Sequence, residues 1–444
     1  MLKSAIKKFI PKFLLSWYHL LLAHTANFVY GHPSDRLIVI GVTGTNGKST
    51  TVNLIAKLLE EAGHSVVLSS TVNFQNGRRE WLNDRKMTMP GRFFLQKLLA
   101  QGAAAGCRFA VIESSSEGIL QHRQIGIHYD CMVFTNLTPE HLTAHGGWEN
   151  YKQAKLEYFR QLQQLPRKKL NGEFIPKTIV ANADDPSCGE FTNFNVDKII
   201  TYAKNSPADL QAQNVAVAEQ GIRFDWHQTH FSLNLKGIFD VYNALAALAV
   251  AQSFGVEPKR CQAALEKIRN VPGRMELIDG GQAFKVLVDY APEPEGLKQM
   301  YQSVQAWKKN KIIHVLGSTG GGRDTDRRLI LGRLAGQQAD YVIVTNEDPY
   351  EDDPQQIIDD VAAGSRDAGK ILNQNLFKIL DRRQAIEFAL RSAQPGDMVI
   401  ITGKGAEQKM AVAGGYIPWD DRQAVRDALA KLKNPAADNH SGDN

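Results

Sequence analysis

Short apolar runs alternate with longer helical stretches along most of the chain after Arg36. In the first half of the sequence these runs are rich in β-branched residues and cover residues 37–40, 109–112 and 131–134. Strands buried on both faces read as continuous apolar runs, and parallel strands need helical connections between them. The pattern therefore predicts a mostly parallel sheet with helices on both faces, in an α/β domain over residues 36–272.

The alternation is less regular between residues 162 and 239. Positions in this section switch between apolar and polar, as at residues 222–226, which is typical of antiparallel edge strands. A helical run over residues 242–254 is expected to close the domain. The middle of the chain is thus predicted to differ from the regular α/β pattern on either side of it.

A turn signal at residues 271–273, Val-Pro-Gly, is followed by a second α/β rhythm. Its apolar runs cover residues 284–288, 312–316, 341–344 and 398–401. They predict a smaller α/β domain over residues 273–434. The remaining residues, 435–444, are small and polar and are expected to form a disordered tail.

The segment before the first strand, residues 1–35, follows a different pattern. It opens with four lysines, Lys3, Lys7, Lys8 and Lys12. An apolar stretch over residues 13–30 follows, in which Ser16, His19 and Asn27 fall on one helical stripe. This predicts a helix with a broad apolar face, interrupted too often to span a bilayer comfortably. Three interpretations stay open: a helix docked on the protein's own surface, a basic helix lying on a membrane, or a signal or anchor.

Composition excludes several classes of protein. The chain has 444 residues, too many for one hydrophobic core, and its 43% hydrophobic and 22% charged residues are typical of soluble globular proteins. A net charge of +5 is too dilute over this length to indicate nucleic-acid binding. The four cysteines form neither the C-x-x-C pairs of a zinc site nor a disulfide scaffold, so a reducing cytoplasm is the simplest interpretation.

A glycine-rich loop, Gly41-Val-Thr-Gly-Thr-Asn-Gly-Lys-Ser-Thr50, gives the strongest chemical signal. It follows the first predicted strand and precedes a helix expected over residues 51–62. Glycines let the backbone wrap around phosphate oxygens, Lys48 neutralises their charge, and Ser49 is suited to ligate Mg²⁺. The predicted phosphate contacts are Gly44, Thr45, Asn46, Gly47, Lys48, Ser49 and Thr50.

The spacing of this loop is specific, because a general G-x-x-x-x-G-K loop would need glycine at Val42. Gly-Thr-Asn-Gly-Lys-Ser instead resembles the loop of the Mur ligases and folylpolyglutamate synthetases. The resemblance to the Mur ligase family runs from residue 37 to about residue 422. It implies a central P-loop ATPase domain, a smaller Rossmann-like C-terminal α/β domain, and amide ligation through an acyl phosphate with ATP and two Mg²⁺ ions.

The resemblance also implies a metal site. Glu113, at a predicted strand end, matches the family's Mg²⁺-binding glutamate, and His141 matches its histidine ligand. Lys155 matches the lysine that becomes carbamylated and then positions a metal. Ser49 completes the set. Taken alone, Glu113 is equally consistent with a solvated carboxylate at a strand end. For Lys155, a surface lysine on a helix stays an open alternative.

Further motifs in the family's order imply nucleotide contacts by Asn243 and Arg274, with Asp289 at the ribose. A buried structural role for Asn243 stays open. A glycine loop begins at Gly317 and is followed by arginines, including Arg327 and Arg328. These arginines would either point their positive charges toward phosphate or form an exposed basic loop.

Three segments resemble the branch of the family that adds the third residue of the peptidoglycan stem peptide. By this resemblance Thr88, Ser115, Gln121 and Arg123 would contact the muramoyl-peptide, and Asp348, Gly403 and Glu407 the amino acid. The acceptor would then be UDP-MurNAc-dipeptide or a related molecule. The second substrate would be diaminopimelate, lysine or a similar amino acid.

The departures from the family's pattern affect this assignment. Residues 347–350, Glu-Asp-Pro-Tyr, stand where diaminopimelate-adding members carry Asp-Asn-Pro-Arg, and loss of the arginine removes a bidentate partner for a carboxylate. The amino acid is therefore open. Glu117 replaces a usual histidine, Glu140 an aspartate and Pro292 a histidine. Only the basic, apolar segment 1–35 stands where the family has a domain that grips the uridine nucleotide.

Two other classes of function stay in consideration. One is a related amide ligase with a lipid-linked, poly-amino-acid or folate-like acceptor, although the muramoyl-type residues argue against folate. The other is a nucleotide-switched scaffold, against which the joint presence of Lys48, Glu113, His141, Lys155 and Asp289 argues. We expect a monomeric enzyme, either free in the cytoplasm or held at the inner face of the membrane.

Overall fold

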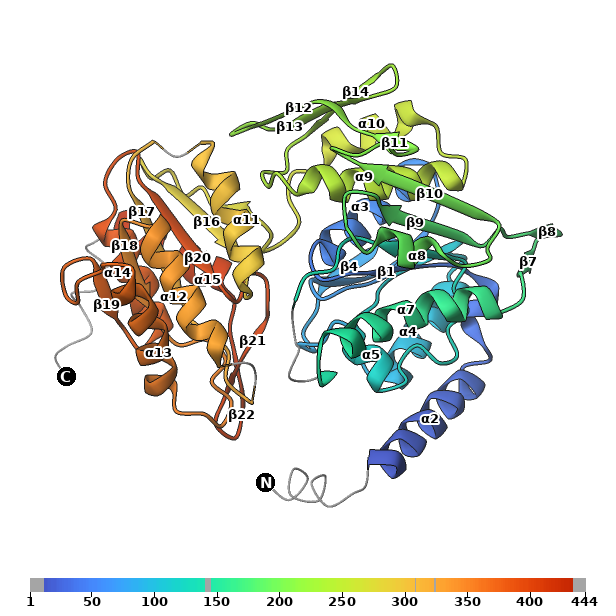
Figure 1. Ribbon diagram of the computed structural model, residues 1–444, viewed down its shortest axis with the longest axis horizontal. Coiled ribbons are helices and arrows are strands. Elements are labelled where there is room, and N and C mark those ends of the chain that lie inside the picture. Colours follow the sequence, from blue (N-terminus) through green and yellow to red (C-terminus); the bar gives the residue numbers. More distant parts are fainter. Residues whose placement is uncertain (1–11, 140–144, 308, 323–324, 434–444) are drawn as a thin grey trace. The chain divides into compact units, whose positions relative to one another are not determined.

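A computed structural model describes residues 12–139, 145–307, 309–322 and 325–433. These residues form two compact units, which Figure 1 shows in different colour ranges. The first contains the described residues up to Val215, together with Arg223–Leu233 and Phe239–Ile268. The second contains Ala216–Ile222, Asn234–Ile238 and the chain from Arg269 onward. His141, Glu140 and the tail 435–444 lie outside the described residues.

A nine-stranded sheet forms the centre of the first unit, with the strand order β11-β10-β9-β6-β1-β5-β2-β3-β4. Its strands are β1 (Ile38–Thr43), β2 (Val66–Ser69), β3 (Asn73–Asn76), β4 (Arg79–Leu82), β5 (Phe109–Glu113), β6 (Cys131–Phe134), β9 (Thr178–Asn182), β10 (Lys198–Ala203) and β11 (Leu210–Gln211). All pairs are parallel from β11 to β2, and β3 and β4 extend the sheet in antiparallel fashion. The predicted, mostly parallel sheet is confirmed.

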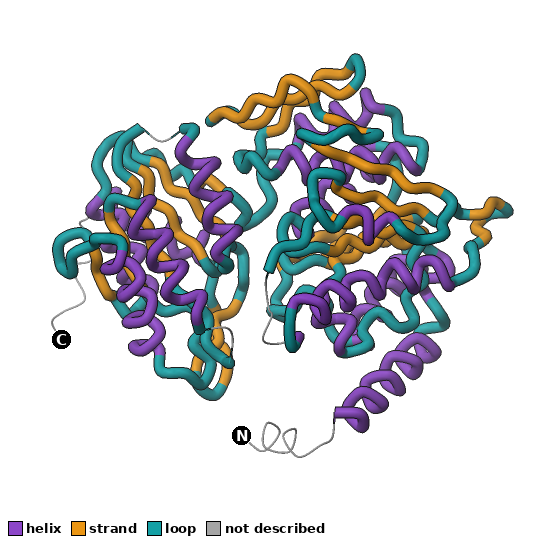
Figure 2. Tube along the Cα trace, viewed as in Figure 1, coloured by secondary structure: helices purple, strands orange, loops and turns teal. Residues whose placement is uncertain are grey.

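Helices cover both faces of this sheet (Figure 2). On one face α3 (Lys48–Glu61) packs against α9 (Asp240–Ser253) and α10 (Pro258–Lys267). On the other lie α4 (Arg92–Ala104), α5 (Ser116–Leu120) and α7 (Trp148–Gln164), with α8 (Cys188–Thr192) beside β9. The apolar side of α7 buries Tyr158, Phe159 and Leu162 in the core, which explains why this strongly polar sequence is helical.

The interpretation of residues 162–239 is partly wrong. β9, β10 and β11 lie in this section and continue the parallel sheet, because β9 is buried along its whole length and pairs with β6. The alternating stretch 222–226 is β13 (Gly221–Trp226), which belongs to a separate three-stranded sheet with β12 (Gln213–Ala218) and β14 (Thr229–Leu233). A small hairpin, β7 (Lys169–Leu170) and β8 (Glu173–Phe174), precedes β9.

The second unit has a six-stranded sheet with the order β15-β16-β20-β17-β18-β19. Its elements are β15 (Glu276–Leu277), β16 (Lys285–Asp289), α11 (Pro294–Gln305), β17 (Ile312–Leu316), α12 (Asp326–Gln338), β18 (Tyr341–Val344), α13 (Pro354–Asp367), β19 (Leu376–Lys378), α14 (Arg382–Ser392), β20 (Met398–Thr402), the hairpin β21 (Lys409–Val412) and β22 (Gly415–Pro418), and α15 (Asp421–Lys433). The four predicted apolar runs are β16, β17, β18 and β20, and all pairs among them are parallel.

Helix α2 (Lys12–Val29) occupies the apolar N-terminal segment and packs beside α4, before the short 3-10 helix η1 (Pro33–Arg36). Small and polar residues make this contact: Ala23 and Ala26 are fully buried, and Ser16 Oγ lies 2.7 Å from His122 Nε2. The large apolar side chains point elsewhere, with Trp17 69%, Leu21 66% and Phe28 77% exposed. The helix thus docks on its own unit through one face and leaves an apolar face uncovered. None of the described helices combines the length and apolar character needed to cross a bilayer.

Candidate active site

The glycine-rich loop joins the end of β1 to the start of α3. Two of its glycines adopt positive φ angles, +149° at Gly44 and +81° at Gly47. A side chain at Gly44 would collide with Thr135, and one at Gly47 with Asn243, so both positions require glycine. Helix α3 begins at Lys48, earlier than the predicted residue 51, because Gly47 turns the chain directly into the helix.

The predicted phosphate contacts Gly44 to Thr50 are therefore gathered around the N-terminus of α3. Backbone N–H groups at a helix start and the positive end of its dipole favour an anion. The Nζ of Lys48 donates a hydrogen bond to the carbonyl oxygen of Thr45, 2.6 Å away, and its side chain remains half-buried. Asn136, after β6, fixes the loop from the other side by accepting a hydrogen bond from the Asn46 N–H at 2.9 Å.

Glu113 ends β5, the strand next to β1, and is 2% exposed. Its Oε2 accepts hydrogen bonds from the Ser49 hydroxyl at 2.9 Å and from the Thr71 N–H at 2.7 Å. The Thr71 hydroxyl donates to Oε1 at 3.0 Å. Glu113 is thus not a solvated carboxylate. It joins the phosphate loop to a loop after β2, and the grouped carboxylate and hydroxyl oxygens fit the preference of Mg²⁺ for oxygen ligands.

Lys155 lies on α7 and is 2% exposed, so it is not a surface lysine. Its Nζ donates a hydrogen bond to the Gly44 carbonyl oxygen at 2.6 Å and lies 4.6 Å from the centre of the Tyr151 ring. The Tyr151 hydroxyl is in turn 3.0 Å from Thr45 Oγ1. An ammonium cannot ligate a metal, so Lys155 fits the predicted metal set only in a carbamylated form. The other predicted ligand, His141, is outside the described residues.

Two of the predicted acceptor contacts of the first unit, Thr88 and Ser115, lie near Glu113. The Thr88 hydroxyl accepts a hydrogen bond from Thr71 Oγ1 at 2.9 Å, so it is one contact away from Glu113. Ser115 caps α5 by accepting a hydrogen bond from the Gly118 N–H at 3.2 Å. The Arg123 guanidinium donates to Gln121 Oε1 at 2.6 Å and to the backbone carbonyl of Met89.

Asn243 lies on α9 and is almost fully buried. Its Oδ1 accepts a hydrogen bond from Thr51 Oγ1 at 3.2 Å, and its Nδ2 donates to Asp240 Oδ1 at 2.8 Å. These contacts tie α9 to α3 beneath Gly47. The geometry gives Asn243 the structural role that was one of its two interpretations.

The predicted nucleotide contacts of the second unit, Arg274 and Asp289, lie close together at the end of β16. Asp289 ends β16 and accepts a hydrogen bond from the Met275 N–H at 2.6 Å. Burial raises the pKa of Asp289, and the nearby Arg274 opposes this shift. The Arg274 guanidinium lies 4.4 Å from the centre of the Tyr290 ring.

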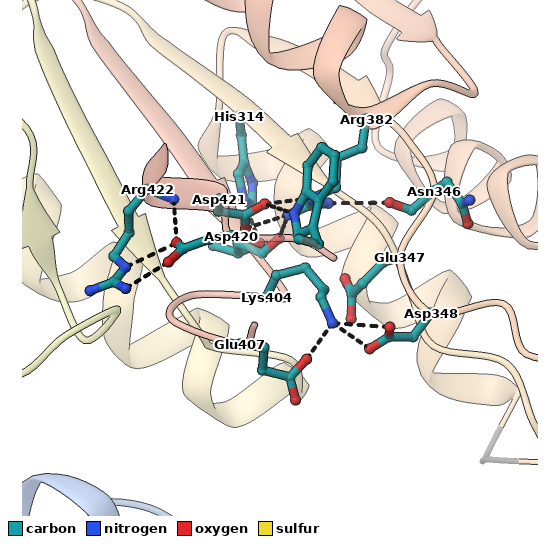
Figure 3. Close-up of polar contacts among 12 residues, drawn as sticks. His314, Asn346, Glu347, Asp348, Arg382, Lys404, Glu407, Asp420, Asp421 and Arg422 are labelled. Carbon is teal, nitrogen blue, oxygen red and sulfur yellow. Dashed lines mark hydrogen bonds and ion pairs between the residues drawn. The ribbon is translucent and has the colours of Figure 1, made fainter. Parts of the chain in front are cut away.

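The predicted amino-acid segment is organised around a buried lysine that sequence reasoning missed. Lys404, which has no exposed surface, donates hydrogen bonds to both oxygens of Asp348, at 3.0 and 2.9 Å, and to Glu407 (Figure 3). The Ala411 N–H also donates to Asp348 at 2.7 Å. Asp348 is therefore held inside the unit, whereas Glu407 is less buried than Asp348 and Lys404. A side chain at Gly403 would collide with Glu347, whose pKa is raised by burial.

Of the two interpretations of Arg327 and Arg328, the exposed basic loop is wrong. Both are about 5% exposed and belong to α12. Arg327 pairs with Glu293, and Arg328 pairs with Asp352 at 3.2 Å and Asp360 at 2.9 Å. Their charges are balanced within the second unit by these three carboxylates.

Thr71 was also missed from the sequence. It follows β2, whose carboxyl end lies at the same edge of the sheet as those of β1 and β5. That position, next to the neighbouring strand's glutamate, is the signal that would have found it. Among the described residues, no group of three or more His, Cys, Asp or Glu side chains forms a metal site by itself.

Known proteins resemble this chain over most of its length. The family model of the Mur ligase middle domain matches residues 42–251, and that of the Mur ligase glutamate ligase domain matches residues 273–405. A UDP-N-acetylmuramyl-tripeptide synthetase of Roseiflexus sp. (strain RS-1) is 40% identical over 424 residues, which cover 93% of this chain and 82% of the relative. A UDP-N-acetylmuramoyl-L-alanyl-D-glutamate--2,6-diaminopimelate ligase of Geobacillus kaustophilus (strain HTA426) is 36% identical and covers 95% and 84%, respectively.

Solved structures of known proteins are also similar to this chain. One of a UDP-N-acetylmuramoyl-L-alanyl-D-glutamate--2,6-diaminopimelate ligase is 31% identical, with a TM-score of 0.59 over 89% of this chain and 79% of that one. A folylpolyglutamate synthase of Mycobacterium tuberculosis, 15% identical, shares the fold with a TM-score of 0.66 over 93% and 95% of the two chains. The phosphate loop, the buried glutamate and lysine beside it, and matches that span both units show that the chain belongs to the Mur ligase family.

Proposed function

We propose that this chain is an ATP-dependent amide ligase that joins a carboxylate of UDP-MurNAc-dipeptide, or of a related acceptor, to the amino group of an amino acid. ATP would be cleaved to ADP and phosphate in the same reaction, which belongs to the synthesis of peptidoglycan precursors. One observation carries the proposal: Ser49 contacts Glu113 at 2.9 Å, and Lys155 contacts the same phosphate loop at 2.6 Å. Residues from three separate elements thus surround one phosphate-binding position.

Each of these residues has a distinct task in this proposal. Lys48 and the N-terminus of α3 would hold the terminal phosphate and stabilise the charge that develops during its transfer to the acceptor carboxylate. Mg²⁺, when bound, would neutralise phosphate charge and polarise the reacting oxygens. The residues that would hold two such ions are Ser49, Glu113, His141 and a carbamylated Lys155. Loss of phosphate from the resulting acyl phosphate then accompanies attack by the amine.

The amino acid proposed is a diamino acid such as diaminopimelate or lysine. Lys404 bonds both Asp348 and Glu407, but Asp348 is buried and also accepts from the Ala411 N–H. Glu407 is less buried, so it is the acid better placed to receive an amino group. Tyr350 stands where diaminopimelate-adding members carry arginine, so this chain lacks that partner for a second carboxylate.

A first test compares two glutamates that lie four residues apart. Glu113→Ala is expected to raise the Mg²⁺ concentration needed for half-maximal turnover by about 10-fold or more, because it removes a ligand from the site. Glu117→Ala, which changes an exposed side chain on α5, is the matched control and should stay near the native value. Glu113→Gln keeps the size of the buried side chain and should resemble Glu113→Ala. Equal losses at Glu113 and Glu117 would contradict the assignment.

We also propose that α2 holds the enzyme at the inner face of the membrane, in which case a lipid-linked acceptor becomes the second candidate. The uncovered face of α2 presents Trp17, Leu21 and Phe28 to solvent, and four lysines occur at or before its first residue. Aromatic and leucine side chains beside lysines are typical of helices that lie in the interface of an anionic bilayer. Each lysine near such a surface contributes about 1 kcal/mol.

Vesicle sedimentation tests this contact. The full chain is expected to sediment with vesicles that contain anionic lipid, and less so as salt concentration rises. Trp17→Ser combined with Leu21→Ser should abolish sedimentation while leaving the contacts of Ala23 and Ala26 intact. Ile371→Ser, an exposed apolar residue of the second unit, is the control and should not change it. A native protein that stays in the supernatant would contradict membrane contact.

A further inference from the structure

Two arginines of the first unit meet at Gln121. Arg92, the first residue of α4, donates a hydrogen bond to the backbone carbonyl of Gln121, and Arg123 donates to its side-chain oxygen at 2.6 Å. Arg123 is a predicted acceptor contact by resemblance, whereas no role was predicted for Arg92. The two guanidinium groups are nevertheless close enough to influence each other.

Neither arginine makes an ion pair within the part of the chain that the structure describes, although the charge of Glu117 acts on Arg123. Burial, and then the charge of Arg123, lower the pKa of Arg92. Burial also lowers the pKa of Arg123, although exposed Glu117 opposes the shift. The Nε atom of each arginine is buried without a hydrogen-bond partner. Two half-buried like charges without a directly paired carboxylate are costly, and a bound anion would lower that cost.

The helix that begins at Arg92 adds to the positive field at this point. Its N-cap is Gly91, which has no side chain to bond the first N–H groups, and no acidic residue lies in its first turn. A cation at a helix N-terminus opposes the helix dipole, whereas an anion there is favoured by both the dipole and the N–H groups. The residues at the start of α4 thus favour a bound anion, whereas they do not themselves stabilise this end of the helix.

We propose that Arg92, Arg123 and the N-terminus of α4 form a subsite for a phosphate group of the acceptor. This inference rests on the proposed ligase function. Two guanidinium groups and the N–H groups of the first turn of α4 provide more donors than one carboxylate can accept, which favours a phosphate. The subsite lies beside α2, since His122 follows Gln121 and contacts Ser16 of that helix at 2.7 Å. A diphosphate in either a nucleotide-linked or a lipid-linked acceptor has this chemistry.

A variant of Arg92 tests the subsite, with Lys97→Gln, an exposed change on the same helix, as the matched control. Arg92→Gln is expected to raise the KM for a diphosphate-bearing acceptor by about 10-fold or more, because it removes a charge-assisted contact. The KM values for ATP and for the amino acid should stay near those of Lys97→Gln. With MurNAc-dipeptide, which carries no phosphate, native protein and Arg92→Gln should have the same KM.

Inhibition by inorganic diphosphate and a comparison of two acceptors complete this test of Arg92. Inorganic diphosphate should inhibit the native enzyme competitively against the acceptor and inhibit Arg92→Gln much less. A KM unchanged from that of Lys97→Gln, or an equal rise in all three KM values with a lower Tm, would mean that Arg92 merely caps α5 and would overturn the proposal. The lower native KM, for UDP-linked or for polyprenyl-diphosphate-linked MurNAc-dipeptide, identifies the source of the phosphate.

The phosphate subsite and the ligase function can be tested separately, one by binding of diphosphate and the other by turnover. If the native protein showed no acceptor-dependent turnover, the ligase function would fail. Binding of inorganic diphosphate, measured by calorimetry on the native protein and on Arg92→Gln, would still decide the subsite. Equal binding by the two proteins would overturn it.

Discussion

Replacement of Lys48 by alanine is expected to reduce acceptor-dependent ADP release by about 10²–10³-fold or more, because the loop loses its charge opposite the transferred phosphate. The fold should survive this change. Lys48 is half-buried at the start of α3, and its truncation opens no cavity in the core. ADP release and Tm, measured on the same preparation, give both quantities.

Lys57→Ala provides the control for this prediction. Lys57 also lies on α3 but pairs at the surface with Glu60 and Glu80, at 3.1 and 3.3 Å. It should retain native turnover with a similar Tm. Near-native turnover in Lys48→Ala would mean that the glycine-rich loop does not hold the transferred phosphate.

Replacement of Lys155 by alanine should also abolish turnover, but a small carboxylic acid such as acetate should partly restore it. The reason is that a carbamate at this position acts as a carboxylate, and an added acid fits the space that the shortened side chain leaves. Because Lys155 is buried, the variant is also expected to lose stability, by about 2–5 kcal/mol as for other large-to-small core substitutions. Turnover is therefore compared with and without acetate at a temperature where the variant is folded.

Lys152→Ala is the matched control, one helical turn away on α7. Lys152 pairs with Glu149 and Glu190 at the surface, and its loss should change neither turnover nor the response to acetate. The native protein is expected to have a mass one CO₂ unit above that of its sequence. An unmodified mass together with no rescue by acetate would contradict carbamylation.

Local patterns in the sequence were sufficient to predict the central parallel strands of both large sheets. The runs at residues 109–112 and 131–134 became β5 and β6, because continuous apolar β-branched sequences fit strands that are buried on both faces. The start of α3 was placed three residues late, since a helix N-terminus depends on the φ angle of Gly47, which the apolar pattern does not reveal.

Features that depend on contacts between residues far apart in the chain were harder to predict from the sequence. The sequence left open whether Arg327 and Arg328 direct their charges to phosphate or form an exposed basic loop, and it did not reveal that Glu293, Asp352 and Asp360 pair with them from distant positions. The roles of Thr71 and Lys404 likewise depend on neighbours brought together only by the fold.

The N-terminal helix illustrates the same limit. Its apolar composition predicted a helix with an apolar face, and α2 confirms the helix. Composition did not reveal that Ala23 and Ala26 would make the contact while Trp17, Leu21 and Phe28 stay exposed. A pattern of hydrophobic positions gives the face of a helix, whereas the packing partner decides which part of that face is covered.

The measurement that tests the central claim most directly is a panel of amino acids, supplied with UDP-MurNAc-dipeptide, ATP and Mg²⁺ and analysed by product mass. We expect at least one diamino acid to yield a product heavier than the acceptor by that amino acid less one water, with one ADP and one phosphate released per product. The Lys48→Ala variant should yield none. Release of ADP that no acceptor or amino acid stimulates, without any ligated product, would contradict the ligase function.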